Sequence, residues 1–306
     1  RRRRIAAEVA AEEMEEDISI SWPKGAAGQL TNEPWMHSSE VNAVFAALAR
    51  DGKEARFVGG CVRNALMHLP IGDIDIATQE TPERVMDLLK AAGIQAVPTG
   101  IEHGTITAVV NGQTFEVTTL RRDVSTDGRR ATVAYTLDWR EDAARRDFTF
   151  NTLSATQDGA IYDYFNGMQD LAHRLIRFVG RVDERIAEDR LRILRYFRFI
   201  AVYGMRIAER YEFQVVVNNA QHLTELSAER IRDELMKIIA STNQHDAVRL
   251  MFEQEIFAII LPEVKDPVWY KRLSWLDSSA IKIDAIGPDA IRRLRSEEHT
   301  SELQSR

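Results

Sequence analysis

The sequence of 306 residues contains one cysteine, Cys61, and this scarcity excludes several classes of protein. A disulfide framework needs paired cysteines, and zinc or iron–sulfur centres built from thiolates need several of them. Long apolar runs are also missing, because a stretch such as residues 257–262 falls far short of the ~20 residues that span a membrane. The opening residues lack the apolar segment of a secretory signal. These absences predict a soluble, cytoplasmic protein with no membrane partner.

An excess of basic charge is lacking as well. The chain carries 40 Lys and Arg against 47 Asp and Glu, a formal net charge of −7. This balance excludes a nucleic-acid protein covered in positive charge, but it leaves room for a local basic groove. With 44% hydrophobic residues over the length of about two ordinary domains, the chain has enough apolar material for a real core.

The hydrophobic pattern of the first half indicates a mixture of helices and strands. Ser39 is expected to cap a helix, and residues 81–92 are expected to form another that has Pro82 at its first position. Asn111-Gly112 between two alternating stretches predicts a hairpin. The strands expected here are residues 56–59, 71–77, 105–110 and 114–120.

The second half is predicted to be helical. From Asp183 onward the apolar residues, such as Ile186 and Ile193, recur with a period of 3.6, and no strands are expected. Ser227 is expected to cap a helix that runs to Ile239.

Both ends of the chain depart from these patterns. Residues 1–36 show no firm apolar stripe and are assigned to an N-terminal extension. Residues 295–306 are polar and closely resemble the translation of a common sequencing-adapter oligonucleotide. We expect the natural sequence to depart from this chain near Leu294; the alternative is an ordinary polar tail.

A glycine pair and two aspartates form the central motif of the first half. The strand at residues 56–59 runs into Gly59-Gly60, where bare backbone N–H groups can approach an anion at the start of a helix. Asp73 and Asp75 are two positions apart in an expected strand, so both carboxylates should point to the same face. Adjacent carboxylates repel each other unless a cation lies between them, and Mg²⁺ takes oxygen ligands and arrives with nucleotide phosphates. The pattern favours an Mg²⁺ site over an exposed strand edge.

Glu116 and a run of arginines extend this motif. Glu116 lies in an alternating stretch, so it is either a third carboxylate of the site or an outward-facing strand residue. Three adjacent pairs of arginines, six residues in all, fall within the 26 positions from 121 to 146. Such runs usually form solvated faces, but guanidinium groups suit phosphate, so phosphate or RNA contact is the favoured interpretation. They are Arg121, Arg122, Arg129, Arg130, Arg145 and Arg146.

Glu188, Asp189 and Arg192 are expected within one helical turn, opposite the apolar stripe. They form either a surface salt bridge or a base-reading site. Cytosine and adenine both present an amino donor beside an unprotonated ring nitrogen, so Asp189 can accept from the amine while Arg192 donates to the ring. Uracil and guanine reverse this pattern and would leave buried polar groups unpaired. The functional interpretation is a site that selects C and A without a template.

These motifs resemble those of the bacterial class II tRNA nucleotidyltransferases, the CCA-adding enzymes, whose relatives are the bacterial poly(A) polymerases. The resemblance covers about residues 40 to 290. The matching segments are Gly59–Asp75, Arg145–Asn151, Asp163–Leu171 and Glu188–Arg192, with a looser match at Ser227–Arg232. It implies an α+β fold, in which a nucleotidyltransferase head with a mixed β-sheet and flanking helices precedes an all-α neck and a truncated all-α body. The expected bounds are 37–178 for the catalytic head, 179–241 for the neck and 242–294 for the RNA-binding body.

The resemblance also implies roles for single residues. Asp73 and Asp75 would hold two Mg²⁺ ions, and Glu116 is grouped with them as catalytic. Asp147 and Asn151 would contact the ribose, and the Asp163–Leu171 segment would couple head and neck. The full set of expected nucleotide-binding residues is Gly59, Gly60, Arg63, Arg122, Arg145, Arg146, Asp147, Asn151, Glu188, Asp189, Arg192 and Arg195.

Two departures from the family pattern are visible in the sequence. Asn64 stands where the family motif usually has aspartate. The chain is also shorter than the family's full length and stops before the tail that grips tRNA there.

The implied reaction is attack of the tRNA 3′-hydroxyl on the α-phosphate of CTP or ATP, with release of pyrophosphate. Residues 99–105 look more like the CCA-adding branch than poly(A) polymerase, which is the alternative within the family. Residues 123–135 resemble the flexible loop that lets such enzymes switch from C to A. The alternative from another class is a non-catalytic RNA-binding module, and the intact Asp73 and Asp75 argue against it. No protein partner is implied.

Overall fold

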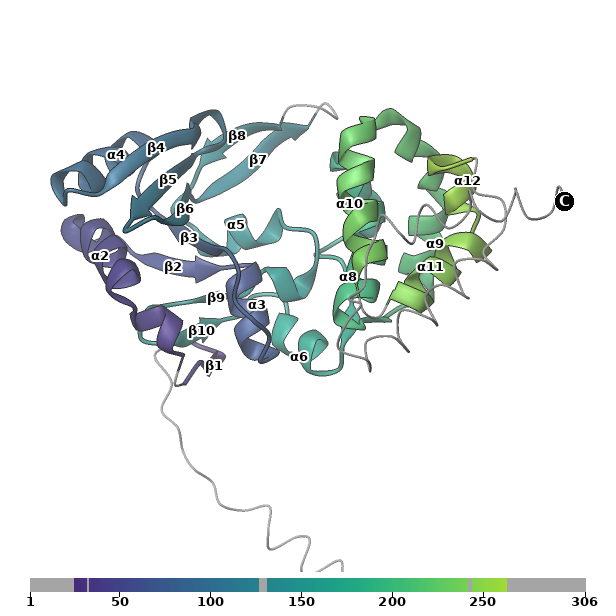
Figure 1. The fold of residues 1–306 in the computed structure, drawn as a ribbon, viewed down its shortest axis with the longest axis horizontal. Coiled ribbons are helices and arrows are strands. Elements are labelled where there is room, and N and C mark those ends of the chain that lie inside the picture. Colours follow the sequence, from purple (N-terminus) through teal and green to yellow (C-terminus); the bar gives the residue numbers. More distant parts are fainter. Residues whose placement is uncertain (1–24, 32, 127–130, 242–243, 263–306) are drawn as a thin grey trace, which may run out of the picture.

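The structure is a computed structural model that describes residues 25–31, 33–126, 131–241 and 244–262. A mixed sheet with its helices forms one side of the molecule, here called the head (residues 28–178), and helices form the other side, the helical region (residues 179–262) (Figure 1). The α+β fold class is therefore confirmed. The expected adapter-derived tail at 295–306 lies outside the described residues, as does the expected body beyond residue 262.

An eight-stranded sheet is the centre of the head. The strands lie in the order β1–β10–β9–β2–β3–β6–β5–β4, and β3 and β6 pair in parallel while the other neighbours are antiparallel. Their bounds are β1 Gly28–Gln29, β2 Ala55–Val58, β3 Ile74–Thr78, β4 Gln95–Gly100, β5 Thr105–Val110, β6 Gln113–Thr119, β9 Ser154–Ala155 and β10 Ala160–Tyr162. β7 (Arg121–Thr126) and β8 (Ala131–Tyr135) form a separate antiparallel pair.

Short helices surround this sheet, and α2 and α4 pack on each other and on the β4–β5–β6 side of it (Figure 1). The helices are α2 Ser39–Leu48, α3 Gly60–Leu66, α4 Pro82–Ala91, α5 Trp139–Ala144 and α6 Gly167–Ala172. The 3₁₀ turns are η1 Pro34–His37, η2 Ala49–Asp51, η3 Ile101–His103 and η4 Thr149–Asn151.

Local sequence chemistry explains where these helices begin. The Thr81 hydroxyl accepts from the N–H of Arg84, and Pro82 occupies the first turn of α4, as predicted. The prediction for α2 was wrong by one residue, because the side chain of Ser38, and not that of Ser39, accepts from the N–H of Val41. Ser38 has the extended backbone that a capping residue needs, whereas Ser39 is already the first helical residue.

Three other expectations for the head differ from the structure. β3 begins at Ile74, so Asp73 precedes the strand instead of lying within it. Residues 28–36, assigned to an N-terminal extension, contribute β1 and η1, and β1 pairs with β10. Residues 123–126 and 131–135, expected in a flexible loop, belong to the paired strands β7 and β8, and residues 127–130 lie outside the described part.

The helical region consists mainly of α7 to α12. Their bounds are α7 Val182–Glu188, α8 Leu191–Tyr203, α9 Arg210–Asn218, α10 Ala228–Ala240, α11 Gln244–Glu253 and α12 Ile256–Ile260, with η5 Ala220–Glu225 between α9 and α10. α8 packs against α10 and α11. Ser227 caps α10 through the N–H of Arg230, as predicted.

Two details of this region correct the sequence reading. The expected continuous helix through Ile186 and Ile193 is two helices, because Asp189 has an extended backbone and its carboxylate accepts from the N–H of Leu191, where α8 begins. A strand also occurs here: β12 (Arg206–Ile207) pairs in parallel with β11 (Leu175–Ile176) of the head.

The head and the helical region share one hydrophobic core. Aromatic rings cross the boundary: Phe148 lies 5.2 Å from Phe199 and Phe178 lies 5.9 Å from Tyr196, measured between ring centroids. These side chains are almost completely buried. The common core fixes the two regions against each other and so fixes the walls of the cavity between them. Among the described residues, no helix is both long and apolar enough to cross a membrane.

Candidate active site

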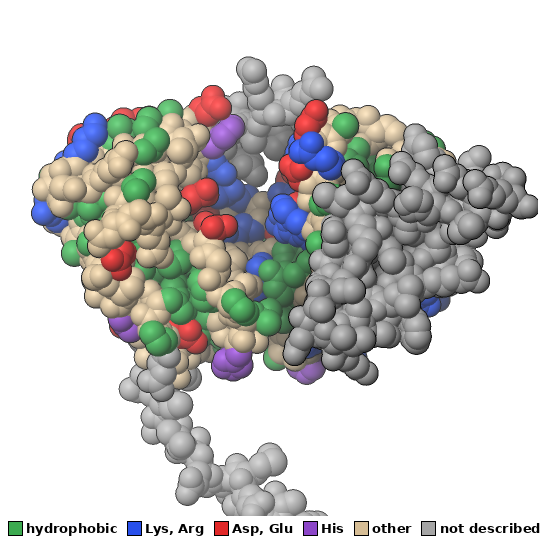
Figure 2. All heavy atoms as spheres, in the orientation of Figure 1, with side chains coloured by type: hydrophobic (Ala, Val, Ile, Leu, Met, Phe, Trp, Pro, Cys, Tyr) green, Lys and Arg blue, Asp and Glu red, His purple; other side chains and the backbone are tan. Residues whose placement is uncertain are grey.

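A cavity of about 530 Å³ lies between the head and the helical region. Figure 2 shows the hollow in the space-filling view, with Lys and Arg side chains gathered on both of its walls. Seven arginines and three aspartates line it, so the cavity carries an excess of positive charge. The lining residues are Gly59, Gly60, Arg63, Asp75, Arg145, Arg146, Asp147, Asn151, Asp189, Leu191, Arg192, Arg195, Arg198, Phe199 and Arg230.

The glycine pair turns the chain from β2 into α3 at the cavity wall. Gly59 has a φ of +68°, a conformation that side chains disfavour. A Cβ atom at Gly59 would also lie 3.2 Å from Nη1 of Arg146. Glycine at this position therefore permits both the turn and the close approach of the Arg146 guanidinium.

Asp75 is the carboxylate of the central motif that lines the cavity. Burial, with the neighbouring charges of Glu116 and Asp73, raises the pKa of Asp75 to about 6, although Arg146 acts in the opposite direction. A divalent cation beside Asp75 would reverse that balance, so the residues here fit such an ion.

The other two carboxylates of the motif flank Asp75 from outside the cavity. Glu116 is the register partner of Asp75 on β6, which brings the residue expected from the neighbouring strand next to it. Asp73 lies two residues before Asp75, and both Asp73 and Glu116 are exposed. Within the described residues, no group of three or more His, Cys, Asp or Glu side chains has an arrangement that could hold a metal ion. Glu116 therefore lies beside Asp75 in the sheet but outside the cavity lining.

The Arg145–Asn151 segment supplies the floor of the cavity. The guanidinium groups of Arg145 and Arg146 pair with the buried Asp142 at 2.9 and 3.1 Å. Asn151 Nδ2 donates to Asp147 Oδ1 at 2.9 Å. Burial alone would raise the pKa of Asp147, but Arg195 and the hydrogen bond from Asn151 hold it below its ordinary value. Asp147 is thus a buried, charged group with its partners in place.

Arg63 connects this floor to the helical region. Its Nη1 donates to Asn151 Oδ1 at 2.6 Å and its Nη2 donates to the Tyr203 hydroxyl at 2.6 Å. Asn64 Oδ1 accepts from Nε and Nη2 of Arg63, while Asn64 Nδ2 donates to the carbonyl of Pro70 at 2.9 Å. A carboxylate at position 64 could not donate that last hydrogen bond.

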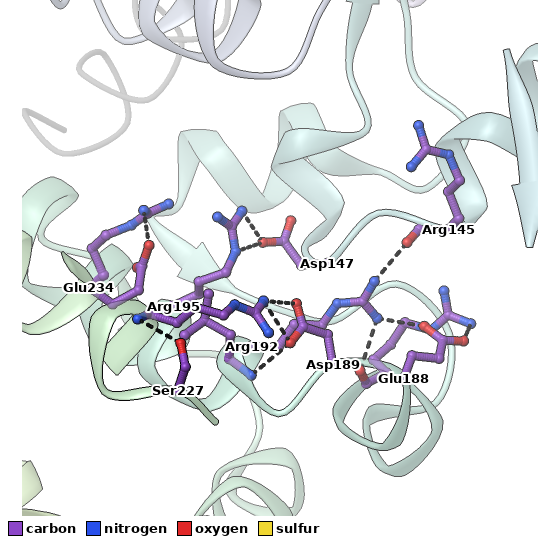
Figure 3. A network of polar contacts seen from close by, with 12 residues as sticks. Arg145, Asp147, Glu188, Asp189, Arg192, Arg195, Ser227 and Glu234 are labelled. Atoms are coloured by element: carbon purple, nitrogen blue, oxygen red, sulfur yellow. Dashed lines mark hydrogen bonds and ion pairs between the residues drawn. The ribbon is translucent and has the colours of Figure 1, made fainter. Parts of the chain in front are cut away.

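The expected base-reading residues do not share one helical turn. Glu188 ends α7, Asp189 lies between the helices and Arg192 belongs to α8 (Figure 3). The expected salt bridge does form, because Arg192 Nη1 donates to Glu188 Oε2 at 2.6 Å, and it is largely buried instead of lying on the surface. Glu188 also pairs with Arg185.

Asp189 and Arg192 nevertheless line the cavity together. Asp189 is held by Arg230 of α10, whose Nη2 lies 2.9 Å from Oδ2 and 3.1 Å from Oδ1. Arg192 Nη2 donates to the carbonyl of Arg145 at 2.9 Å. The two residues expected to read the base are thereby held by contacts from both walls of the cavity.

The cavity brings together most of the residues expected from the sequence. Those that line it are Gly59, Gly60, Arg63, Asp75, Arg145, Arg146, Asp147, Asn151, Asp189, Arg192 and Arg195. Those that do not are Asp73, Glu116, Glu188 and Arg122. Arg122, on β7, is exposed and lies 3.9 Å from Glu141. The functional roles of all these residues stay predictions.

Sequence reasoning missed four lining residues: Leu191, Arg198, Phe199 and Arg230. Arg198 follows Arg195 on α8 by three positions, which is a helical-face signal that was available. Arg198 Nη1 donates to Glu234 of α10 at 2.8 Å. Arg230 lies in the loosely matched segment Ser227–Arg232, but residue spacing could not indicate its contact with Asp189, which is 41 positions away in the chain.

Comparison with known protein families matches two segments of the chain. Residues 55–177 match the family described as "Poly A polymerase head domain". Residues 204–266 match the family described as "Probable RNA and SrmB- binding site of polymerase A".

Curated proteins and solved structures give a similar result. The chain is 39% identical over 255 residues to mitochondrial CCA tRNA nucleotidyltransferase 1 of Homo sapiens, covering 81% of this chain and 56% of that one. It is 40% identical over 230 residues to the CCA-adding enzyme of Oceanobacillus iheyensis, covering 74% and 55%. The crystal structure of the Bacillus stearothermophilus CCA-adding enzyme in complex with CTP matches with a TM-score of 0.69 and 33% identity, covering 79% of this chain and 57% of that one. The chain spans about half the length of the curated relatives it matches.

Proposed function

The chain belongs to the class II tRNA nucleotidyltransferase family, and from that premise we propose that it adds CMP and AMP from CTP and ATP to the 3′ end of tRNA. Pyrophosphate is released at each addition. The proposed product is a tRNA that ends in CCA, the sequence in the names of the similar enzymes. The partner is tRNA, and the RNA-binding match at residues 204–266 supports this choice.

One observation carries the proposal: groups suited to phosphate chemistry and groups suited to base recognition line the same cavity. Gly59, Gly60 and Asp75 lie on the head side, and Asp189 and Arg192 lie on the helical side. The excess of arginine over aspartate complements a polyanionic triphosphate.

For the chemical step, Asp73 and Asp75 would hold Mg²⁺, and Glu116 would add negative charge beside them. When bound, the metal activates the attacking hydroxyl and stabilises the leaving pyrophosphate. Arg146 lies against Gly59 and would bind the phosphates from the head side. Asp147 and Asn151 would contact the ribose.

For base selection, the contacts of Asp189 and Arg192 leave hydrogen-bonding capacity for a base. A carboxylate has about four acceptor positions, and at Asp189 the Leu191 N–H and Arg230 use some of them. Arg192 has five N–H donors, and three are used: Nη1 donates to Glu188 and to the carbonyl of Arg185 at 2.9 Å, and Nη2 donates to the carbonyl of Arg145. The amine of cytosine or adenine would bind Asp189, and the ring nitrogen would accept from Arg192.

We propose the cytoplasm as the compartment. Cys61 is the one cysteine of the chain, and burial raises its pKa to about 11, which makes it an inert thiol suited to a reducing environment.

A product-length assay tests the proposed function. A tRNA that lacks its terminal CCA is incubated with the chain and CTP, ATP or both, with Mg²⁺ or with a chelator, and the products are resolved at single-nucleotide length. CCA addition predicts two additions with CTP alone and three with both nucleotides, only when Mg²⁺ is present. Long tracts made with ATP alone would identify a poly(A) polymerase, and binding of the tRNA without any extension would identify a non-catalytic RNA-binding module.

A further inference from the structure

We propose that Tyr203, in the last turn of α8, positions the sugar-contacting amide of the cavity and so contributes to selection of ribose over deoxyribose. The proposal rests on the proposed function, since it concerns the sugar of the incoming nucleotide. Tyr203 is absent from the cavity lining, and its hydroxyl accepts a hydrogen bond from Arg63, which does line the cavity. It is therefore a positioning residue.

Arg63 is almost fully committed to contacts within the protein. Its four hydrogen bonds go to Asn64, twice, to Asn151 and to Tyr203. Since a guanidinium carries five N–H groups, one remains. Arg63 is only 7% exposed, and burial lowers its pKa. The Arg63 guanidinium consequently holds neighbouring side chains in place and has little capacity left to bind phosphate.

The amide of Asn151 is the lining group that Arg63 holds in place. Arg63 donates to its Oδ1, and its Nδ2 donates to Asp147 Oδ1. These two bonds fix which end of the amide is oxygen and which is nitrogen. An amide offers two donor and two acceptor positions, so one of each remains at a buried side chain that lines the cavity. A hydroxyl is both donor and acceptor, and the 2′-hydroxyl of a ribose suits this remaining pair.

Helix α8 supports this amide at both of its ends. Tyr203 holds Arg63 on the Oδ1 side. Arg195, two turns earlier on the same helix, donates from Nε to Asp147 Oδ2 at 2.6 Å on the Nδ2 side. The helix that carries the base-reading Arg192 thus also sets the orientation of the expected sugar contact. Loss of the Tyr203 hydroxyl would release one end of that support.

The ring of Tyr203 is held independently of its hydroxyl. It stacks on Phe199 with ring centroids 5.4 Å apart and an interplanar angle of 22°. The guanidinium of Arg63 also lies 4.4 Å from the centre of the Tyr203 ring. Tyr203→Phe should keep both contacts and remove the hydrogen bond alone, which makes it a clean test.

The test compares CTP with 2′-deoxy-CTP as substrates and as ligands. The wild-type chain, Tyr203→Phe and the control Tyr211→Phe are assayed for kcat and KM with a tRNA acceptor that lacks CCA, and for Kd by calorimetry. Tyr211 lies on α9 and is 68% exposed. In Tyr203→Phe the preference for CTP over 2′-deoxy-CTP should fall roughly fivefold to tenfold, about 1–1.4 kcal/mol, mainly through KM and Kd. Tyr211→Phe should leave the preference unchanged.

A second variant covers the case in which Tyr203→Phe folds poorly. Asn64→Ala releases Arg63 from its other restraint and should lower the same preference. An unchanged preference in both variants, or equal weakening of CTP and 2′-deoxy-CTP, would overturn the sugar role and leave the proposed function standing. A wild-type chain that extends no tRNA would refute the proposed function, and the ratio of the two Kd values would still decide the inference. A wild-type chain that binds neither nucleotide would refute both.

Discussion

The two walls of the cavity are built on different principles. On the head wall, burial and the neighbouring charges of Glu116 and Asp73 raise the pKa of Asp75. On the helical wall, Asp189 and Arg192 are each held by partners of opposite charge, Arg230 and Glu188. Under the proposed function, the head wall supplies a carboxylate for a cation, whereas the helical wall supplies recognition groups whose side chains are already oriented by ion pairs. Chemistry and selection should therefore respond differently to substitution.

The largest expected effect is at Asp75. Asp75→Asn should lower nucleotide addition by about a thousandfold or more, because a neutral amide cannot hold a catalytic cation. The melting temperature should stay level or rise at pH 7.5, since a pKa of about 6 in the folded state against an ordinary 3.8 means that the charge opposes folding above pH 6. Incorporation of labelled CMP and a thermal melt measure the two quantities. Asp87→Asn, an exposed site on α4, is the control, and near-wild-type activity in Asp75→Asn would refute the metal site.

The next effect concerns the helical wall. Asp189→Ala should reduce selectivity for CTP over UTP by roughly 10- to 100-fold, because a hydrogen bond to a charged group contributes ~1.5–3 kcal/mol and UTP never used it. The measurement is kcat/KM for the four nucleoside triphosphates on one tRNA acceptor. Asp183→Ala offers a matched control, since Asp183 also pairs with an arginine, Arg181, but lies outside the cavity. Equal selectivity in the two variants would mean that the base is read elsewhere.

A smaller effect is expected at the seam between the two regions. Glu212 of α9 is buried and accepts from the N–H of Phe178 at 3.4 Å, and burial raises its pKa from 4.5 to about 7. The folded chain thus binds a proton that the unfolded chain has released, so the stability contribution of Glu212 falls as the pH rises from about 4.5 to 7. In urea unfolding, the free energy of unfolding of Glu212→Gln minus that of wild type should be ~1–2 kcal/mol larger at pH 8 than at pH 4.5. A difference independent of pH, as expected for the exposed control Glu83→Gln, would contradict this assignment.

The smallest effect is predicted for Arg122. Its side chain is 58% exposed and its distance to Glu141 is 3.9 Å, so Arg122→Ala should change the free energy of unfolding by less than ~0.5 kcal/mol. Because Arg122 lies outside the cavity, KM for CTP should change by less than about twofold, in contrast to Arg146→Ala on the head wall. A large rise in KM would show that the phosphate-binding surface extends to β7.

Local signals in the sequence predicted the local structure well. The cap at Thr81, the hairpin at Asn111-Gly112 and the cap at Ser227 depend on a few neighbouring residues, and the structure has all three. Many of the cavity-lining residues could be predicted because they belong to short sequence motifs, such as Gly59-Gly60 at the end of β2.

The failures concern local competition for a backbone N–H in one case and contacts between distant segments in the others. Arg192 satisfies the spacing of a helical pair with Glu188, but the spacing could not reveal the helix break at Asp189, where a side chain competes for the N–H of Leu191. Arg230 and Tyr203 were missed for a related reason. Each acts on a residue far away in the chain, and one sequence carries no signal for such pairs.

The shared hydrophobic core has a consequence for folding cooperativity. Phe148 of the head packs on Phe199 of the helical region inside one continuous cluster that holds most of the buried apolar residues of both regions, so unfolding either described region would expose part of the core of the other. The two regions are then expected to behave as one foldon, with a common opening free energy for hydrogen exchange. A destabilising substitution deep among the helices, for example at Met251, would then lower the cellular abundance of chains with a folded head, without changing any residue that lines the cavity.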